Sequence, residues 1–195
     1  SSRILNRLLL PAGIGSSMSD VELTQVREAH KFDEAALAAY MQTHVEDFDG
    51  PLTIKQFEGG QSNPTFQLIT PTQTYVMRKQ PPGELLPSAH QVDREFKVMA
   101  ALWNTPVPVP KMYCLCEDSS IIGTKFYVME MVEGRLFTET RLPSCNKSER
   151  SAIYLDLARV LAELHNVDPV SVGLSEFGRP GNYYERQIGR WSKQY

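Results

Sequence analysis

A pair of glycines followed by polar residues, Gly59-Gly60-Gln61-Ser62-Asn63, lies between two apolar segments. Because glycine has no Cβ, such a loop lets backbone N–H groups approach a phosphate closely. The same composition is typical of an ordinary hairpin turn. These residues alone do not separate the two interpretations, so the neighbouring segments have to.

The segment after the loop excludes two common phosphate-binding arrangements. A Walker A loop needs Gly-Lys-Ser/Thr at the start of a helix, whereas Asn63-Pro64-Thr65 has no lysine and precedes a predicted strand. A Rossmann turn also leads directly into a helix, within a parallel unit. A third arrangement is a hairpin folded over a nucleotide, which needs a cation on a later strand and a carboxylate on the next helix.

Arg78 and Glu95 supply these two charges. Because side chains alternate along a strand, Arg78 is expected on the same face as Val76, which would face the nucleotide, while Lys79 should point outward. Glu95 would anchor the Arg78 guanidinium as the strand lysine and helix glutamate pair in kinases. Taken singly, these features are more often a turn, a strand end and a solvated helix face. Their order along the chain favours the third arrangement, a hairpin folded over a nucleotide.

The elements that would position these residues can be predicted from hydrophobic periodicity and capping signals. Strands are predicted at 52–57, 66–70, 75–78, 112–116 and 125–131. Helices are predicted after the N-caps Asp33 and Ser88, after Ser148 with core positions Ile153, Leu157, Leu161 and Leu164, and after Asn182. Short loops join the first three strands, which indicates an antiparallel meander.

This order predicts an α+β fold with three parts. Residues 1–32 form an N-terminal extension, residues 33–134 a lobe with a five-stranded antiparallel sheet and helices, and residues 135–195 the beginning of a truncated helical lobe.

Composition excludes several classes of protein. The chain has 195 residues, 42% of them hydrophobic, and a net charge of −3, which is typical of a globular protein without a nucleic-acid surface. No apolar run is long enough to span a membrane. Cys114, Cys116 and Cys145 are odd in number and lack C-x-x-C spacing, so we predict neither a disulfide framework nor a zinc site, and an intracellular setting.

The first 19 residues allow two interpretations. They contain Arg3 and Arg7, no acidic residue, and an apolar stripe if helical, which is the composition of a transit peptide. Met18 is equally suited to be a true start preceded by a remnant that is not native. The segment therefore does not fix a compartment.

The loop, the segment Tyr75-Val76-Met77-Arg78-Lys79 and four further residues, Asp93-Arg94-Glu95-Phe96, together resemble the aminoglycoside phosphotransferase-like kinases. Phe126-Tyr127-Val128-Met129-Glu130-Met131-Val132-Glu133-Gly134 and Leu161-Ala162-Glu163-Leu164-His165 add to the resemblance, which runs from about Phe32 to Tyr195. More narrowly, these segments resemble the N-terminal kinase domain of certain acyl-CoA dehydrogenase family proteins. The resemblance implies a protein-kinase-like fold.

The resemblance also implies which residues bind ATP. The loop from Gly59 to Asn63 would cover the phosphates, Arg78 would replace the usual strand lysine, and Glu95 would be its helix partner. Met129 would stand at the back of the adenine pocket, although an ordinary core position explains this residue equally well. The carbonyl of Glu130 and the N–H of Val132 would bond the adenine.

The His-Gly-Asp and Asp-x-Asp motifs of this family are not found in the sequence. His165 is followed by Asn166, and Asp168-Pro169 is predicted to be a turn. Transfer of a phosphoryl group depends on a positioned base and on metal ions. We therefore assign no catalytic residue and no metal ligand, place the Mg²⁺ ligands outside this chain, and expect the chain alone to be nearly inactive.

The leading hypothesis is the ATP-binding part of a small-molecule phosphotransferase that transfers the γ-phosphoryl group of ATP to a hydroxyl. The resemblance implies a hydroxyacyl-CoA acceptor in fatty-acid catabolism, a mitochondrial or peroxisomal location, and a covalently linked dehydrogenase domain as the only holder of FAD. The alternative is a non-catalytic nucleotide-binding or assembly module. A coding sequence that continues past Tyr195 into both missing motifs favours the kinase, and a stop codon there favours the module.

We expect marginal solubility for the isolated chain. Ile188 and Trp191 lie on the apolar side of the last predicted helix, where they would lack helices to pack against. Thermal unfolding of the isolated chain measures this, and a stable, cooperative transition would contradict it.

Overall fold

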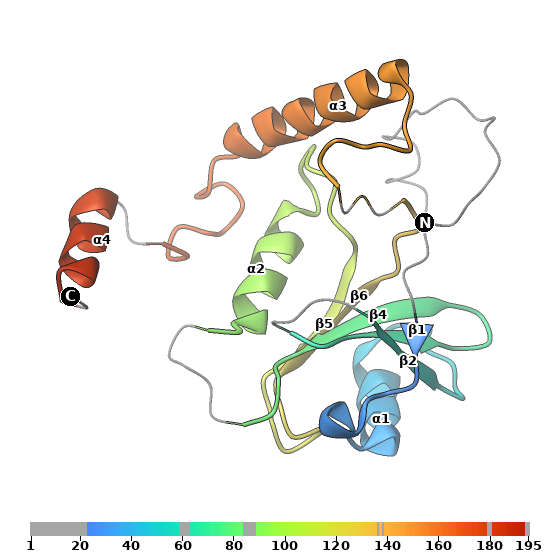
Figure 1. Cartoon of the computed structure of the whole chain (residues 1–195). Coiled ribbons are helices and arrows are strands. Elements are labelled where there is room, and N and C mark those ends of the chain that lie inside the picture. Colours follow the sequence, from blue (N-terminus) through green and yellow to red (C-terminus); the bar gives the residue numbers. More distant parts are fainter. Residues whose placement is uncertain are drawn as a thin grey trace.

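The fold is that of a computed structural model, which describes residues 23–58, 63–83, 89–135, 137, 139–178 and 181–193. Four predicted loop residues, Gly59, Gly60, Gln61 and Ser62, lie outside this part, as do residues 1–19, Ser88 and Tyr195. The described part is an α+β arrangement built on one antiparallel sheet (Figure 1).

The sheet has six strands in the order β1-β2-β3-β4-β6-β5. Their bounds are Leu23–Thr24 (β1), Thr53–Phe57 (β2), Thr65–Ile69 (β3), Thr74–Lys79 (β4), Met112–Cys116 (β5) and Phe126–Glu130 (β6). The five predicted strands and their meander are confirmed, but the predicted strand number is one too low. The extra strand, β1, pairs Leu23 with Phe57 and Thr24 with Gln56, and two residues are too short to show a periodicity.

Within the described ranges, four α-helices accompany the sheet, together with a short 3-10 helix at Glu28–His30 (η1). The α-helices are Glu34–His44 (α1), Val92–Leu102 (α2), Lys147–His165 (α3) and Tyr183–Trp191 (α4). The predicted cap of α1 is confirmed, since the Asp33 carboxylate accepts a hydrogen bond from the Ala36 N–H at 2.9 Å.

Two other predicted N-caps are wrong. The cap of α2 is Gln91, and the cap of α3 is Asn146 instead of Ser148. Asn146 and Glu149 form a capping box in which each side chain accepts from the backbone N–H of the other. This reciprocal pair satisfies two free donors of the helix start, so Ser148 falls inside the first turn.

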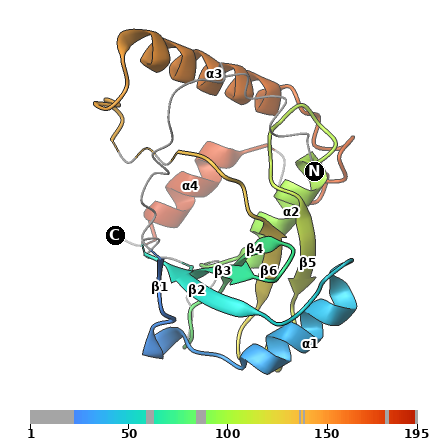
Figure 2. The same ribbon diagram turned by 90° about the vertical axis from the view of Figure 1, so that its right-hand side faces the viewer.

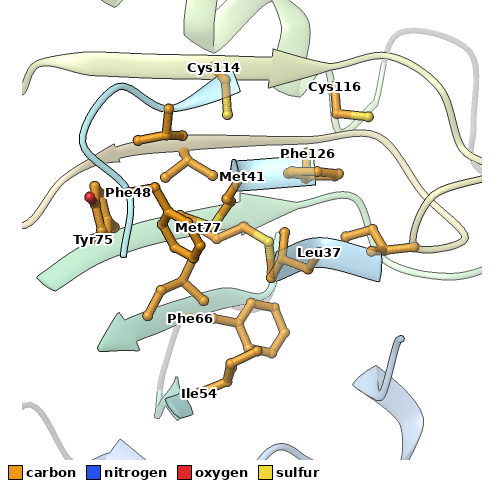
Figure 3. Packing of buried hydrophobic residues seen from close by; sticks show 14 residues of the cluster. Leu37, Met41, Phe48, Ile54, Phe66, Tyr75, Met77, Cys114, Cys116 and Phe126 are labelled. Carbon is orange, nitrogen blue, oxygen red and sulfur yellow. The ribbon is translucent and has the colours of Figure 1, made fainter. Parts of the chain in front are cut away.

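The core lies between the sheet and α1 (Figure 3). Leu37 and Met41 of α1 are fully buried there, against the sheet residues Phe66, Met77 and Phe126. The second helix, α2, lies on the other side of the sheet (Figures 1 and 2). The two faces of the sheet are therefore covered by different helices.

The three cysteines are free and buried. Burial raises the pKa of the Cys114 thiol to about 12, so it stays protonated and behaves as a small apolar side chain. No helix within the described ranges has both the length and the apolar character that a membrane span requires.

The helices after the sheet do not bury the positions predicted to be core. Leu157, Leu161 and Leu164 of α3 are exposed, as are Ile188 and Trp191 of α4. Both views place α3 on the far side of the molecule from α1 (Figures 1 and 2). The helical spacing was predicted correctly, but among the residues that the structure describes this stripe does not pack into a core.

Lys79 points inward, and its predicted outward orientation is wrong. It shares a face of β4 with Tyr75 and Met77, and only 2% of the residue is exposed. Its ammonium lies over the Phe32 ring, 5.6 Å from the centroid. The alternation along β4 was predicted correctly, but the sequence did not show that this face is the one covered by α1.

We predict that Lys79→Met stabilises the fold. Burial lowers the pKa of Lys79, so below that pKa the folded state bears the cost of a desolvated charge. Replacing the charge should raise the melting temperature at pH 7 by roughly 2–4 °C, which corresponds to about 1 kcal/mol.

The pH dependence supplies a second readout. Between the lowered folded pKa and the ordinary lysine value of 10.5, the unfolded state binds more protons, so wild-type stability rises with pH. The advantage of Lys79→Met should therefore shrink as the pH rises through this range. Lys55→Met, at a half-exposed position of β2, is the matched control. An equal gain from both variants at all pH values would refute the role of burial.

Candidate functional site

Four side chains come together on the face of the sheet that is turned away from α1. Three of them were predicted as site residues, and the fourth, Tyr127, is new. In the register of β4 and β6, Val76 lies opposite Met129 and Arg78 lies opposite Tyr127. Because side chains alternate, all four share one face. The ring of Phe96 from α2 lies 6.2 Å from that of Tyr127, which places α2 over the same face.

The predicted partners Arg78 and Glu95 meet above this face. Arg78 Nε lies 3.1 Å from Glu95 Oε2, and about one third of each side chain is exposed, 34% and 35%. The Nε–H is not aligned for a hydrogen bond, so the contact is an ion pair set by proximity of charge. The partial exposure leaves the guanidinium accessible to a ligand.

Glu95 has further partners that the sequence did not reveal. The Tyr127 hydroxyl donates to Oε2 at 3.0 Å, and the Asn63 amide Nδ2 donates to Oε1 at 3.2 Å. Burial, followed by the negative charge of Glu95, raises the pKa of Tyr127 well above its ordinary value, so the phenol remains a donor. Both carboxylate oxygens of Glu95 are therefore engaged.

Asn63, the last residue of the predicted loop, is buried, with only 3% exposed. Its Oδ1 lies 2.8 Å from Nδ1 of His90. In turn, Gln80 Nε2, just after β4, donates to the backbone carbonyl of His90 at 2.9 Å. The structure thus ties the end of the loop and the start of α2 to the Arg78–Glu95 pair.

Tyr127 and His90 were missed for different reasons. Tyr127 lies two residues before Met129, so strand alternation could have placed it on the same face. Its position opposite Arg78 depends on the register of β4 and β6, which the sequence does not display. His90 lies inside the segment predicted to be helical after Ser88, and neither its left-handed backbone nor its contact with Asn63 leaves a pattern in the sequence.

The residues predicted to contact adenine lie along β6 and just beyond it. Val76 is buried beside half-buried Met129, and Val132 is 43% exposed. The Glu130 side chain accepts from the Lys111 N–H at 3.1 Å, so it is turned toward the segment before β5. The Glu130 side chain is thus engaged within the protein, and the adenine contacts of the Glu130 carbonyl and the Val132 N–H remain predictions.

The outer side of α2 is held by the segment between α3 and α4. The guanidinium of Arg94 lies 3.8 Å from the centroid of the Phe177 ring, and its Nη2 donates to the Phe177 carbonyl at 2.8 Å. A cavity of about 420 Å³ lies beside this contact, between α2 and residues 173–177. The helix that carries Glu95 is thus fixed from both sides.

The part of the chain that the structure describes offers no evident metal site. No three His, Cys, Asp or Glu side chains gather there in an arrangement for a metal ion. Asp168 is confirmed as a turn residue, because its carboxylate accepts from the N–H groups of Val170 and Ser171 at 3.1 and 3.2 Å.

Comparison with known proteins yields relatives along nearly the whole chain. Human acyl-CoA dehydrogenase family member 11 is 47% identical over 189 residues, which cover 95% of this chain and 24% of the human protein. The chicken protein of the same name is 45% identical over 176 residues, 88% of this chain and 22% of the relative. The chain therefore spans about a quarter of the length of these relatives.

A solved structure and a family model agree on the kind of domain. The crystal structure of a "putative aminoglycoside phosphotransferase" from Ralstonia eutropha superposes with a TM-score of 0.73 at 53% identity, covering 85% of this chain and 47% of that one. Residues 53–195 match the model of the phosphotransferase enzyme family. This match begins at β2 and includes every residue of the Arg78–Glu95 cluster, and the chain therefore belongs to the phosphotransferase enzyme family.

Proposed function

We propose that this chain is the ATP-binding part of a longer small-molecule phosphotransferase that transfers the γ-phosphoryl group of ATP to a hydroxyl. The observation that carries the proposal is the accessible Arg78–Glu95 pair on the face that also holds Val76 and Met129. A cation beside an apolar surface suits a nucleotide, which has a charged phosphate end and a flat apolar base.

Arg78 would bind the phosphates. Its guanidinium stays charged at any physiological pH and can present two parallel donors to phosphate oxygens. Glu95 contacts it through Nε, so the two terminal nitrogens can point toward a ligand. An arginine in place of lysine can thus contact both groups at once, with one nitrogen at the carboxylate and two nitrogens at the phosphate.

Val76 and Met129 would form an apolar wall against the adenine, whose edge would bond the Glu130 carbonyl and the Val132 N–H. When bound, Mg²⁺ would neutralise charge that develops on the transferred phosphoryl group. Glu95 does not fit as its ligand, because Arg78, Tyr127 and Asn63 already engage both oxygens. Because the sequence contains neither His-Gly-Asp nor Asp-x-Asp, we place the magnesium ligands and the catalytic base outside this chain.

We further propose a hydroxylated acyl-CoA as the phosphate acceptor. The support is indirect, since relatives that contain this domain are named as acyl-CoA dehydrogenases. Phosphate on the acyl hydroxyl would be a good leaving group for a covalently linked FAD-dependent dehydrogenase domain, in mitochondria or peroxisomes. The coding sequence downstream of residue 195 tests the phosphoryl transfer itself, because it should contain His-Gly-Asp and Asp-x-Asp.

In the longer protein, MgATP should raise the melting temperature, and Arg78→Ala should remove most of that shift. Binding at about 100 times Kd adds about 2.7 kcal/mol, or roughly 5–10 °C for a domain of this size. Without Arg78, the phosphates lose their fixed cation. Thermal unfolding with and without MgATP measures both effects.

Arg159→Ala is the matched control, since it removes an arginine that pairs with Asp156 and Glu163 on α3, away from the sheet. It should keep the full shift with MgATP. If wild type shows no shift, or if both variants lose it equally, the assignment of Arg78 to nucleotide binding is wrong.

A further inference from the structure

We propose that His90 and Asn63 are positioning residues, which hold the Glu95 carboxylate in the orientation that faces Arg78. This inference rests on the proposed binding of ATP and adds to it two groups that act on phosphate binding through Glu95. The contacts form one chain, from His90 Nδ1 to Asn63 Oδ1, from Asn63 Nδ2 to Glu95 Oε1, and from Glu95 Oε2 to Arg78 Nε.

Chemistry fixes the direction of each hydrogen bond in this chain. An ionised carboxylate only accepts, so Asn63 must turn its NH₂ group toward Glu95. Its carbonyl oxygen then faces His90, and an oxygen acceptor there requires a proton on Nδ1. The imidazole is therefore a donor, and together with Glu95 it holds the amide in this one orientation.

Both ends of the Asn63 side chain are engaged inside the protein. The residue is 3% exposed, and an unpaired polar group at such a position would cost about 1–3 kcal/mol. Its amide therefore holds Glu95 instead of reaching a phosphate. This explains why an asparagine ends the loop, next to the carboxylate of α2.

The backbone of His90 supports a positioning role. Its φ is 55°, in the left-handed region, which costs a non-glycine residue of order 1–3 kcal/mol. Its carbonyl is held by Gln80 Nε2 and by the Val92 N–H, both at 2.9 Å. Such a conformation persists only where the surroundings enforce it, and here it directs the imidazole at Asn63 across the start of α2.

A matched pair of variants at His90 tests the donor, using the longer protein that carries this chain. His90→Gly keeps the left-handed backbone and removes the donor, whereas His90→Asn tolerates that backbone and offers an N–H at the same distance from Cα. Isothermal titration measures the affinity for MgATP and, separately, for adenosine, which has no phosphate.

We expect His90→Gly to weaken MgATP binding roughly fivefold to tenfold, the value of one internal hydrogen bond. Adenosine affinity should stay unchanged, because the base does not contact Arg78. His90→Asn should restore MgATP affinity to within about twofold of wild type. Equal losses for ATP and adenosine, or the same loss in both variants, would show a packing role and overturn the inference.

A double variant tests whether His90 acts through Glu95. In a Glu95→Ala background no carboxylate is left to orient, so adding His90→Gly should change MgATP affinity by less than about twofold. Additive losses would overturn the inference. Normal MgATP binding by His90→Gly would overturn the positioning role of His90 but not the proposed function. If the wild type does not bind MgATP, both are overturned.

Discussion

The arrangement of this domain depends on the carboxylate of Glu95, at which a strand, a helix and the end of a loop meet. An ion pair that is one third exposed contributes only about 0–1 kcal/mol by itself, which is too little to fix the position of a helix. Hydrogen bonds to a charged group contribute about 1.5–3 kcal/mol each. Tyr127 and Asn63 donate two of these, so they, more than the opposite charge, set where Arg78 is held.

The two faces of the sheet differ in polarity and in what they contact. The face toward α1 is largely apolar and holds the main cluster of buried hydrophobic side chains, whose burial stabilises the fold. The opposite face carries the polar cluster and is covered by α2 (Figure 2). A rigid sheet with a dry side can hold strained and polar groups on its other side, such as the left-handed backbone at His90.

Two neighbouring cations of β4 illustrate this division. Arg78 lies on the polar face, where its charge is paired and accessible, while Lys79 lies on the apolar face over the Phe32 ring. A lysine on the polar face would present a single ammonium to both the carboxylate and a phosphate. The arginine offers separate nitrogens to each, which suits a position that must be held and also bind.

The sequence by itself determined the order of the elements, the antiparallel meander and the alternation that puts Val76 with Arg78, because these features depend on local periodicity and short loops. It also placed Glu95 on the helix that meets the strand. The tertiary structure alone decided that Tyr127 lies opposite Arg78, that Lys79 is buried beside Phe32, and that His90 reaches Asn63. Each of these depends on strand register or on packing between segments far apart in the chain, and neither leaves a local pattern in the residues.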